Sequence, residues 1–169
     1  MHRSDEAIRT GRPAARFIFQ GGPAAREAAN RGFGVPLPTI ACRAEIAGER
    51  AALWLGPDEW LLLAPPGEGD AMIAALENTL AGQPHSLVDV THRQVALSVV
   101  GPQARDLLAS GCPLDLAPES YPVDMCTRTL FAKAEVVLWR RSAEEYHLET
   151  GRSFSGYVLG WLREAQRGG

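Results

Sequence analysis

Two stretches of the chain resemble each other closely, and this internal repeat constrains the fold more than any other feature of the sequence. They read "ALWLGPDEWLLLAPPGEGDAMIAALENTL" and "VLWRRSAEEYHLETGRSFSGYVLGWLREA". Leu53-Trp54 in the first matches Leu138-Trp139 in the second, and the next strand candidate opens with Glu59-Trp60 in one and Glu145-Tyr146 in the other. Each stretch therefore predicts a β-hairpin followed by a helix.

Apolar residues at helical spacing follow both hairpins. We expect one helix from about Asp70 to Leu80, with Asp70 as its N-cap, and another from Ser153 to about Ala165, with Ser153 as its N-cap. The expected core-facing residues occupy equivalent places in the two helices: Met72, Ile73, Leu76 and Leu80 in the first, and Tyr157, Val158, Trp161 and Leu162 in the second.

The repeat predicts an α+β protein built from two similar units, each with an antiparallel sheet and amphipathic helices that share a core. We expect one domain over residues 39–169, with pseudo-repeats over about 39–82 and 86–167. The alternative is chance, because short Leu-Trp hairpins followed by a helix resemble one another even in unrelated chains.

The first 38 residues contain several arginines, glycines and prolines, but only one apolar cluster, "RFIFQGG". A segment with so little apolar surface cannot offset its ordering entropy by itself. We therefore expect 1–38 to be an N-terminal arm with little regular structure, which is either mobile or docked on a partner.

The stretch "VDVTHRQVALSVVGPQARDLLASGCPLDL" changes its alternation part-way. The valines at 88 and 90 occupy even positions, whereas the apolar residues at 95, 97 and 99 occupy odd ones. One uninterrupted strand cannot direct all five to the same face of a sheet. A turn or bulge is therefore expected in "THRQ", then a second strand, and then a helix that begins after "VVGP".

The same stretch contains an acid, a base and a thiol, Asp89, His92 and Cys112, which would form a nucleophilic site if they met in space. A simpler interpretation is structural: Asp89 closes a turn that holds His92, and Cys112 follows the end of a helix. The cysteines at 42, 112 and 126 also lack the close spacing of zinc ligands. We predict no catalytic, cofactor-binding or metal-binding residue in this chain.

Charge and cysteine content limit the partners and the compartment. The formal net charge is −3 and the arginines are scattered, which argues against nucleic acid as a partner. Three widely spaced cysteines favour a reducing compartment, and no signal peptide opens the sequence. The apolar runs are far shorter than the roughly 20 residues that cross a bilayer. We expect a cytoplasmic protein without a membrane partner.

Five blocks, in this order, carry a family resemblance: "FGVPLP", "ALWLGPDEWLLLAP", "DVTHRQVALSVVGPQARDLLASGCPLDL", "YPVDMCTRTLFAKAEVVLWR" and "RSFSGYVLGWL". Together they resemble the gamma subunit of heterotetrameric sarcosine oxidase over nearly everything after about Arg31. The resemblance implies a structural or assembly subunit, noncatalytic by itself, of a bacterial complex with alpha, beta and delta partners, chiefly alpha.

The resemblance also implies what the whole complex does. It would oxidatively demethylate sarcosine to glycine and form hydrogen peroxide and 5,10-methylenetetrahydrofolate. FAD, FMN, NAD and tetrahydrofolate would belong to the alpha and beta subunits and zinc to the delta subunit, so this chain would bind none of them. A further possibility is a chaperone that assists assembly of the oxidase.

A looser similarity points to the aminomethyltransferase (glycine-cleavage T-protein) fold. "DVTHRQVALSVVGPQARDLL" resembles the strand, turn and helix that contain "D-x-S-H-R" in that family, and "TLFAKAEVVLWR" stands where it has "L-L-N-x-x-G-G-I-x-D-D". Here Glu135 is the only carboxylate of the hairpin, so the resemblance implies the scaffold without the chemistry. The alternative function is a stand-alone tetrahydrofolate-binding or one-carbon-transfer protein with an aromatic-lined pocket between the halves.

Large aromatic residues and arginines near turns are the candidates for contact with a partner, because these types dominate interface hot spots. Trp54, Trp60, Trp139, Trp161, Tyr146 and Tyr157 are mostly expected in the core, with one or two exposed. The candidate interface residues are Trp60, Arg93, Arg128 and Arg152. Solvated surface charge is the alternative for each arginine.

Overall fold

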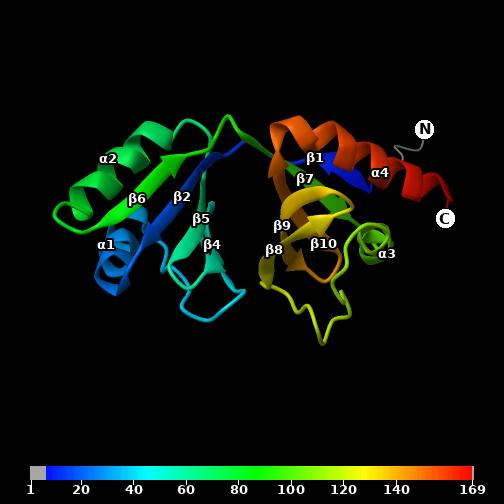
Figure 1. Ribbon diagram of the computed structural model, residues 1–169, viewed down its shortest axis with the longest axis horizontal. Coiled ribbons are helices and arrows are strands. Elements are labelled where there is room, and N and C mark those ends of the chain that lie inside the picture. The colour runs from blue at the N-terminus through cyan, green and yellow to red at the C-terminus, as the bar shows by residue number, and fades with distance from the viewer. Residues whose placement is uncertain (1–6, 169) are drawn as a thin grey trace. The chain divides into compact units, whose positions relative to one another are not determined.

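The computed structural model describes residues 7–168, in which the chain forms two units (Figure 1). The N-unit comprises Pro13–Arg93. The C-unit comprises the segment that ends at Arg12 and the chain from Gln94 onward. The chain therefore contributes one strand to the C-unit, builds the whole N-unit, and then completes the C-unit.

The N-unit is a five-stranded antiparallel sheet with two helices, in the strand order β3-β4-β5-β2-β6. Its strands are β2 (Ala15–Gly21), β3 (Ala44–Ala47), β4 (Arg50–Gly56), β5 (Glu59–Ala64) and β6 (His85–Asp89), and its helices are α1 (Pro23–Phe33) and α2 (Gly69–Thr79).

The expected N-terminal arm over 1–38 is wrong for the part that the structure describes. Residues 8–33 contain β1 (Ile8–Thr10), β2 and α1, while residues 1–6 lie outside the described part of the chain. The "RFIFQGG" cluster is the reason, because β2 lies between β5 and β6 and buries Phe17 and Phe19 completely. The segment gains its apolar contacts from strands distant in sequence, which its own composition does not reveal.

The core of the N-unit lies between the sheet and the two helices. Phe19 of β2 stacks on Trp60 of β5 with ring centroids 5.8 Å apart. The helices approach each other closely at Gly32, where a Cβ would lie 3.0 Å from the Ala75 carbonyl oxygen and would clash with the Thr79 side chain. Glycine at this position therefore permits the contact between α1 and α2.

The C-unit is also a five-stranded antiparallel sheet with helices, in the strand order β1-β7-β10-β9-β8. Its later elements are β7 (Gln94–Val100), α3 (Ala104–Ala109), β8 (Cys126–Phe131), β9 (Ala134–Ser142), β10 (Glu145–Gly151), the short 3₁₀ helix η1 (Arg152–Phe154) and α4 (Ser155–Gly168). The α+β class with two antiparallel sheets is thus as the repeat predicts.

A buried arginine and a buried tyrosine fix the connection between α3 and β8 against the sheet of the C-unit. The Tyr121 hydroxyl donates to the Leu138 carbonyl oxygen at 2.6 Å. The Arg140 guanidinium donates to the Tyr121 carbonyl oxygen at 2.8 Å and lies over the Tyr146 ring, 5.6 Å from its centroid. The Tyr121 carbonyl group, which lies in a segment without regular strand pairing, is satisfied in this way.

The strand registers correct the alignment of the repeat by one residue. Trp54 pairs with Trp60, Arg140 pairs with Tyr146, and an irregularity follows each pair at the hairpin end. Members of the two pairs are 86 positions apart, so Leu53-Trp54 corresponds to Trp139-Arg140 rather than to Leu138-Trp139. The sequence favours the other alignment because it matches identical residues, Leu-Trp with Leu-Trp, whereas the observed register places the buried Arg140 at the position equivalent to Trp54.

The boundaries of the units also differ from those expected. The predicted turn in "THRQ" is confirmed at residues 91–93, but β6 before it pairs with β2 and so belongs to the N-unit. The N-unit therefore extends over Pro13–Arg93 rather than 39–82. Asp70 lies in the first turn of α2 but not at its N-cap, which is Glu68, and α4 begins at Ser155, after η1.

Candidate functional site

The Asp89 carboxylate serves the turn after β6. It accepts the backbone N–H of Thr91 at 2.8 Å, and the Thr91 hydroxyl accepts the backbone N–H of Arg16 in β2 at 2.9 Å. The side-chain hydrogen bond with Thr91 lowers the pKa of Asp89, so the carboxylate is ionised at neutral pH. His92 is exposed in the same turn. This arrangement is the turn closure that the sequence favoured.

Cys112 is a core residue of the C-unit. Its side chain is buried with Leu107 and Leu108 of α3, and its backbone N–H donates to the Leu108 carbonyl oxygen at 2.9 Å. Burial raises the pKa of the Cys112 thiol, which keeps it protonated and unreactive at neutral pH. Asp89, His92 and Cys112 therefore lack the activated nucleophile that a catalytic triad needs.

Sequence reasoning missed a buried carboxylate in the C-unit. Glu149 of β10 is fully buried, and its Oε1 lies 2.8 Å from Nε2 of His147 on the same strand. The His147 ring meets the Trp139 ring edge-on with centroids 5.7 Å apart, and His147 is only partly exposed. Buried carboxylates are paired in this way because an uncompensated buried charge is costly.

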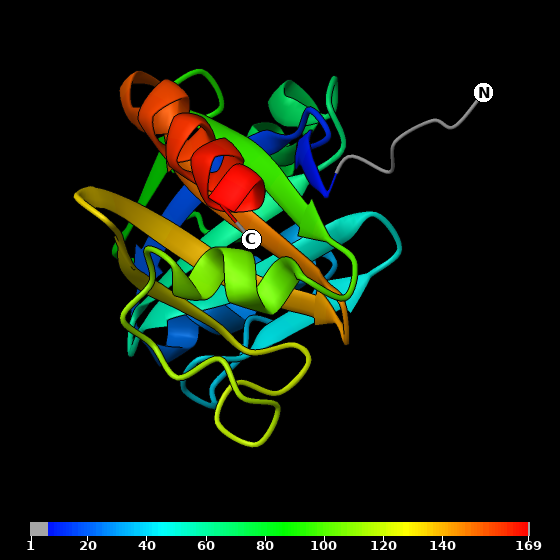
Figure 2. The same ribbon diagram turned by 90° about the vertical axis from the view of Figure 1, so that its right-hand side faces the viewer.

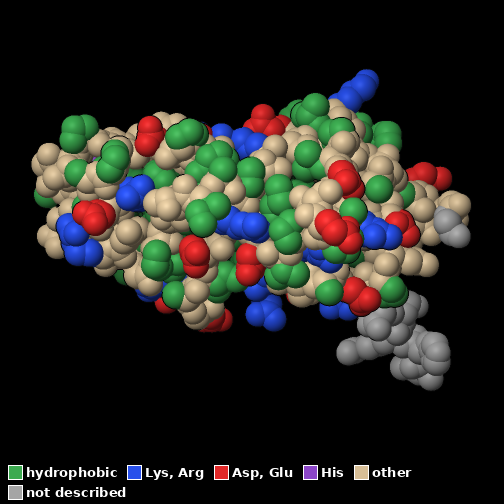
Figure 3. All heavy atoms as spheres, turned by 90° about the horizontal axis from the view of Figure 1, so that it is seen from below, with side chains coloured by type: hydrophobic (Ala, Val, Ile, Leu, Met, Phe, Trp, Pro, Cys, Tyr) green, Lys and Arg blue, Asp and Glu red, His purple; other side chains and the backbone are tan. Residues whose placement is uncertain are grey.

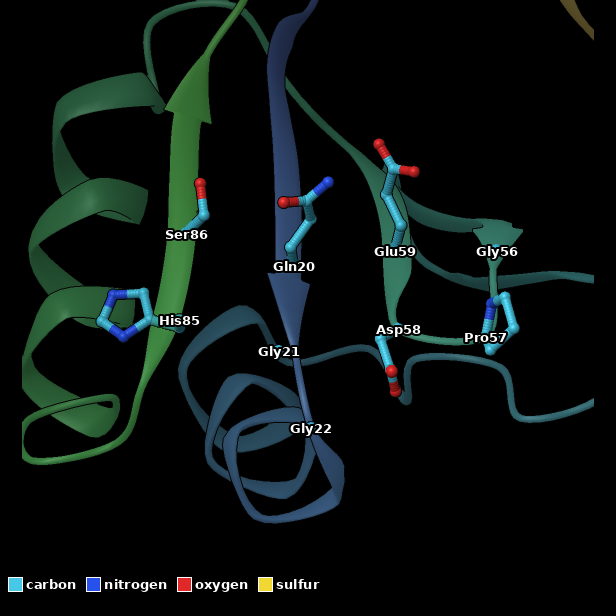
Figure 4. A pocket seen from close by; sticks show the side chains of 9 residues that line it. All are labelled: Gln20, Gly21, Gly22, Gly56, Pro57, Asp58, Glu59, His85 and Ser86. Atoms are coloured by element: carbon cyan, nitrogen blue, oxygen red, sulfur yellow. The ribbon is translucent and has the colours of Figure 1, made fainter.

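An open hollow of about 600 Å³ lies at one end of the N-unit sheet, next to the start of α1 (Figure 4). His85 is already engaged, because its Nδ1 is 2.7 Å from the Gln83 carbonyl oxygen and its ring stacks on Phe19. The carboxylates of Asp58 and Glu59 point in different directions in Figure 4. The side chains of the hollow do not converge on one point, as those of a binding or catalytic pocket do.

The metal-ligating side chains of residues 7–168 are scattered. No group of three or more His, Cys, Asp or Glu side chains in this part of the chain could hold a metal ion. None of its helices is both long and apolar enough to cross a membrane. On the face seen in Figure 3, lysine and arginine side chains are interspersed with acidic and apolar ones, without the concentrated basic surface that nucleic acids need.

The structure separates the four candidate interface residues into one core residue and three surface residues. Trp60 is only 1% exposed and its indole N–H donates to the Pro38 carbonyl oxygen at 2.8 Å, so it offers no surface to a partner. Arg93, Arg128 and Arg152 are exposed, in the turn after β6, on the edge strand β8 and at the start of η1. Arg128 and Arg152 do not lie on neighbouring strands, because β9 lies between β8, which contains Arg128, and β10, which ends just before Arg152.

A row of half-exposed aromatic side chains along η1 and α4 is the largest exposed aromatic feature of the described residues. Figure 2 shows the ribbon of α4, in orange to red, lying in front of the sheet of the C-unit. We call this row the aromatic face: Phe154, Tyr157 and Trp161 are 48%, 39% and 40% exposed. Val158 and Leu162 of the same helix are fully buried against the sheet. Tyr157 and Trp161 thus lie beside the buried stripe, not within it as the sequence suggested, because each residue turns the helix by about 100°.

The comparison with known families decides the identity. The model of the sarcosine oxidase gamma subunit family matches residues 20–167. The chain belongs to this family.

Curated members of the family match at the level of sequence. Sarcosine oxidase subunit gamma of Corynebacterium sp. (strain U-96) is 35% identical over 138 residues, which cover 82% of this chain and 66% of that protein. The protein of the same name from Corynebacterium sp. (strain P-1) is 34% identical over 134 residues, which cover 79% of this chain and 64% of that protein. The chain thus spans about two thirds of the length of these relatives.

Solved structures extend the family match to the fold. A chain of the heterotetrameric sarcosine oxidase from Corynebacterium sp. U-96, in complex with pyrrole 2-carboxylate, has a TM-score of 0.87 at 28% identity, over 94% of this chain and 82% of that one. The glycine cleavage system aminomethyltransferase T from Bartonella henselae has a TM-score of 0.69 at 17% identity, over 92% of this chain and 44% of that one. The latter establishes a shared fold.

The hairpin that resembles the aminomethyltransferase motif contains no buried acid in this family member. Glu135, at the start of β9, is exposed, while the next three positions, Val136 to Leu138, are buried apolar residues. A general acid or base needs a carboxylate directed into a pocket that holds substrate. The hairpin instead contributes to sheet and core.

Proposed function

We propose that this chain is the gamma subunit of a heterotetrameric sarcosine oxidase and that it serves the complex as a structural, noncatalytic subunit in the cytoplasm. Its partners are the alpha, beta and delta subunits, chiefly alpha. The match to a chain of the heterotetrameric enzyme at a TM-score of 0.87, together with the family model over residues 20–167, carries the proposal.

The complex would oxidise sarcosine to glycine and form hydrogen peroxide and 5,10-methylenetetrahydrofolate. Its FAD, FMN, NAD, tetrahydrofolate and zinc would be bound by the other subunits. Two observations on this chain support that division of labour. The Cys112 thiol is buried, and the Asp89 carboxylate is engaged in its turn, so neither group is poised for chemistry.

Co-expression with the alpha, beta and delta subunits tests the assembly role. The expected result is a complex that contains all four chains in equal amounts after size exclusion. A chain that elutes alone would contradict the proposal, and a chain that is present only in immature complexes would indicate a chaperone.

Substitution tests the noncatalytic role. Complexes that contain His92→Ala or Cys112→Ser are expected to retain the kcat of the wild-type complex for sarcosine, because neither side chain would touch substrate. A kcat that falls by more than tenfold while the complex stays intact would contradict the proposal. Calorimetric titration of the isolated chain with tetrahydrofolate tests the alternative function, because micromolar binding would support a stand-alone folate-binding protein.

A further inference from the structure

We propose that the aromatic face of α4 is the surface through which this chain docks on a larger subunit of the oxidase, in a groove that is apolar and bordered by carboxylates. The inference rests on the proposed function, because it assigns the partner of a chain that belongs to a four-subunit assembly. It goes beyond the proposed function by naming the surface that makes the contact and the chemistry of the partner's surface.

The aromatic face is already ordered for binding. The Trp161 ring meets the Phe131 ring edge-on with centroids 6.4 Å apart, and the Tyr157 ring lies 6.2 Å from the Trp161 ring. The Trp161 indole N–H donates to the Ser110 hydroxyl at 3.2 Å, which fixes α4 to the end of α3. Tryptophan and tyrosine are the commonest hot-spot residues of interfaces, and side chains that are already held lose little entropy on binding.

The charge around the aromatic face indicates an acidic partner surface. The segment from Arg152 to Gly168 contains three arginines and one glutamate, in a chain whose formal net charge is −3. All three arginines are exposed, and Arg167 forms an ion pair with Glu164 at 3.0 Å. Complementary charge at the rim of an interface raises the association rate and disfavours wrong partners.

The same charge argues against a second copy of this chain as the occupant. In a two-fold symmetric dimer the aromatic face would meet itself and bring like-charged arginine rims together. A membrane surface is also disfavoured. A helix that lies in a membrane interface inserts its apolar stripe, but the stripe of α4 that contains Val158 and Leu162 is already buried in the core.

Two glycines within α4 leave the helix surface open beside the aromatic residues. A Cβ added at Gly156 or at Gly160 would meet no other atom within 4 Å. Glycine inside a helix is unfavourable by itself, and nothing within the described chain occupies the space above these positions. A partner that approaches the backbone at Gly160 would explain the glycine, and a larger side chain there would block the partner without harming the fold.

The test measures binding of the full chain to a purified complex of the alpha, beta and delta subunits by surface plasmon resonance. Gly160→Gln is expected to bind about thirtyfold more weakly, as for loss of a hot spot. Its thermal midpoint should not fall, since glutamine is the better helix former. Ala74→Gln, on the exposed side of α2, is the matched control and should bind within about twofold of the wild type. Tyr157→Ala should weaken binding in the same direction as Gly160→Gln.

The outcomes separate this inference from the proposed function. A wild-type chain that binds none of the three subunits would overturn both. Unchanged binding of both Gly160→Gln and Tyr157→Ala would overturn the docking surface and leave the proposed function standing. The inference also fails if Gly160→Gln abolishes a wild-type dimer in ultracentrifugation, or removes binding to vesicles of phosphatidylcholine and phosphatidylserine. The inference is supported if both variants bind the complex more weakly and neither of these two other effects is seen.

Discussion

The helices α2 and α4 occupy the same place in the two halves of the repeat, yet only their inward faces are alike. α2 buries Met72 and Leu76 and α4 buries Val158 and Leu162, each against the sheet of its own unit. Outward, α2 exposes small residues such as Ala74, whereas α4 exposes the aromatic face. The fold constrains only the side of each helix that meets the core.

The charges of the two helices differ in the same way. The segment from Glu68 to Leu80 contains three acidic residues and no basic one, whereas the segment from Arg152 to Gly168 contains three arginines and one glutamate. Each helix buries a stripe against the sheet of its own unit, so the core does not require the difference between their outer surfaces. This charge difference is one basis for our proposal that the outer face of α4 binds a partner.

Truncation of the inward faces has the largest expected effect and tests their equivalence. Leu76→Ala and Leu162→Ala each remove a fully buried side chain, and each should lower the free energy of unfolding by about 2–5 kcal/mol. Urea unfolding monitored by circular dichroism measures both. If Leu162→Ala costs less than about 1 kcal/mol, α4 is not a core helix in the sense that α2 is.

One glycine in each unit should respond to substitution by alanine with a change in stability of opposite sign. At Gly32 the new Cβ would meet the Ala75 carbonyl oxygen at 3.0 Å and clash with Thr79, so Gly32→Ala should destabilise the N-unit by about 1–3 kcal/mol. At Gly160 the space is open, and Gly160→Ala should stabilise the chain by about 0.5–1 kcal/mol. Thermal unfolding checks the signs, and a destabilising Gly160→Ala would contradict the open surface.

The presence of α2, of α4 and of the turn after β6 was predictable from the sequence because each follows local rules. The 3.6-residue spacing predicts α2 and α4, and the change of alternation between Val90 and Val95 predicts the turn that the structure has at residues 91–93. Long-range pairing was not predictable. β1 and β2 lie in what the composition identifies as an arm, and their order comes from pairing with β7 and β5, far along the chain.

The candidate site also contains features that local sequence predicts and features that it does not. The structural role of Asp89 follows from its spacing to Thr91, which is typical of a side chain that closes a turn. The burial of Trp60 and the exposure of Trp161 do not follow from the sequence, because both are tryptophans in strongly apolar surroundings. Which of them faces solvent depends on strand register and helix phase: an error of one residue moves a strand side chain to the other face and turns a helix side chain by about 100°.

Removal of one arginine from the outer face of α4 has a smaller expected effect and tests the charge difference between the helices. Arg163→Gln should slow association with the other oxidase subunits about two- to fivefold at low salt, since an attractive rim charge is lost. The difference should shrink at 0.5 M salt, where screening is strong. Arg31→Gln, in the last turn of α1, is the control. Equal slowing by both variants would show that net charge, not the α4 face, governs the encounter.

The smallest expected effect compares an Asp-closed turn in each unit. Asp89 in the N-unit and Asp115 in the C-unit each accept the backbone N–H two residues later, at 2.8 and 3.0 Å. The side-chain hydrogen bond with Thr91 lowers the pKa of Asp89, and that with Ser120 lowers the pKa of Asp115.

A lowered pKa means that the ionised form stabilises the fold. This stability is present above the unfolded pKa of about 3.9 and is lost as the pH falls through the folded pKa. Asp89→Asn should therefore cost no more than about 0.5 kcal/mol at pH 7, because solvent screens the exposed carboxylate, and the difference from the wild type should shrink below about pH 4. Asp115→Asn should cost less, because Ala117 and Ser120 lie in its own loop, whereas Thr91 connects the Asp89 turn to β2 through Arg16. Urea unfolding at pH 7 and pH 3 measures both variants, and a cost of Asp89→Asn that grows as the pH falls would contradict the role of the carboxylate.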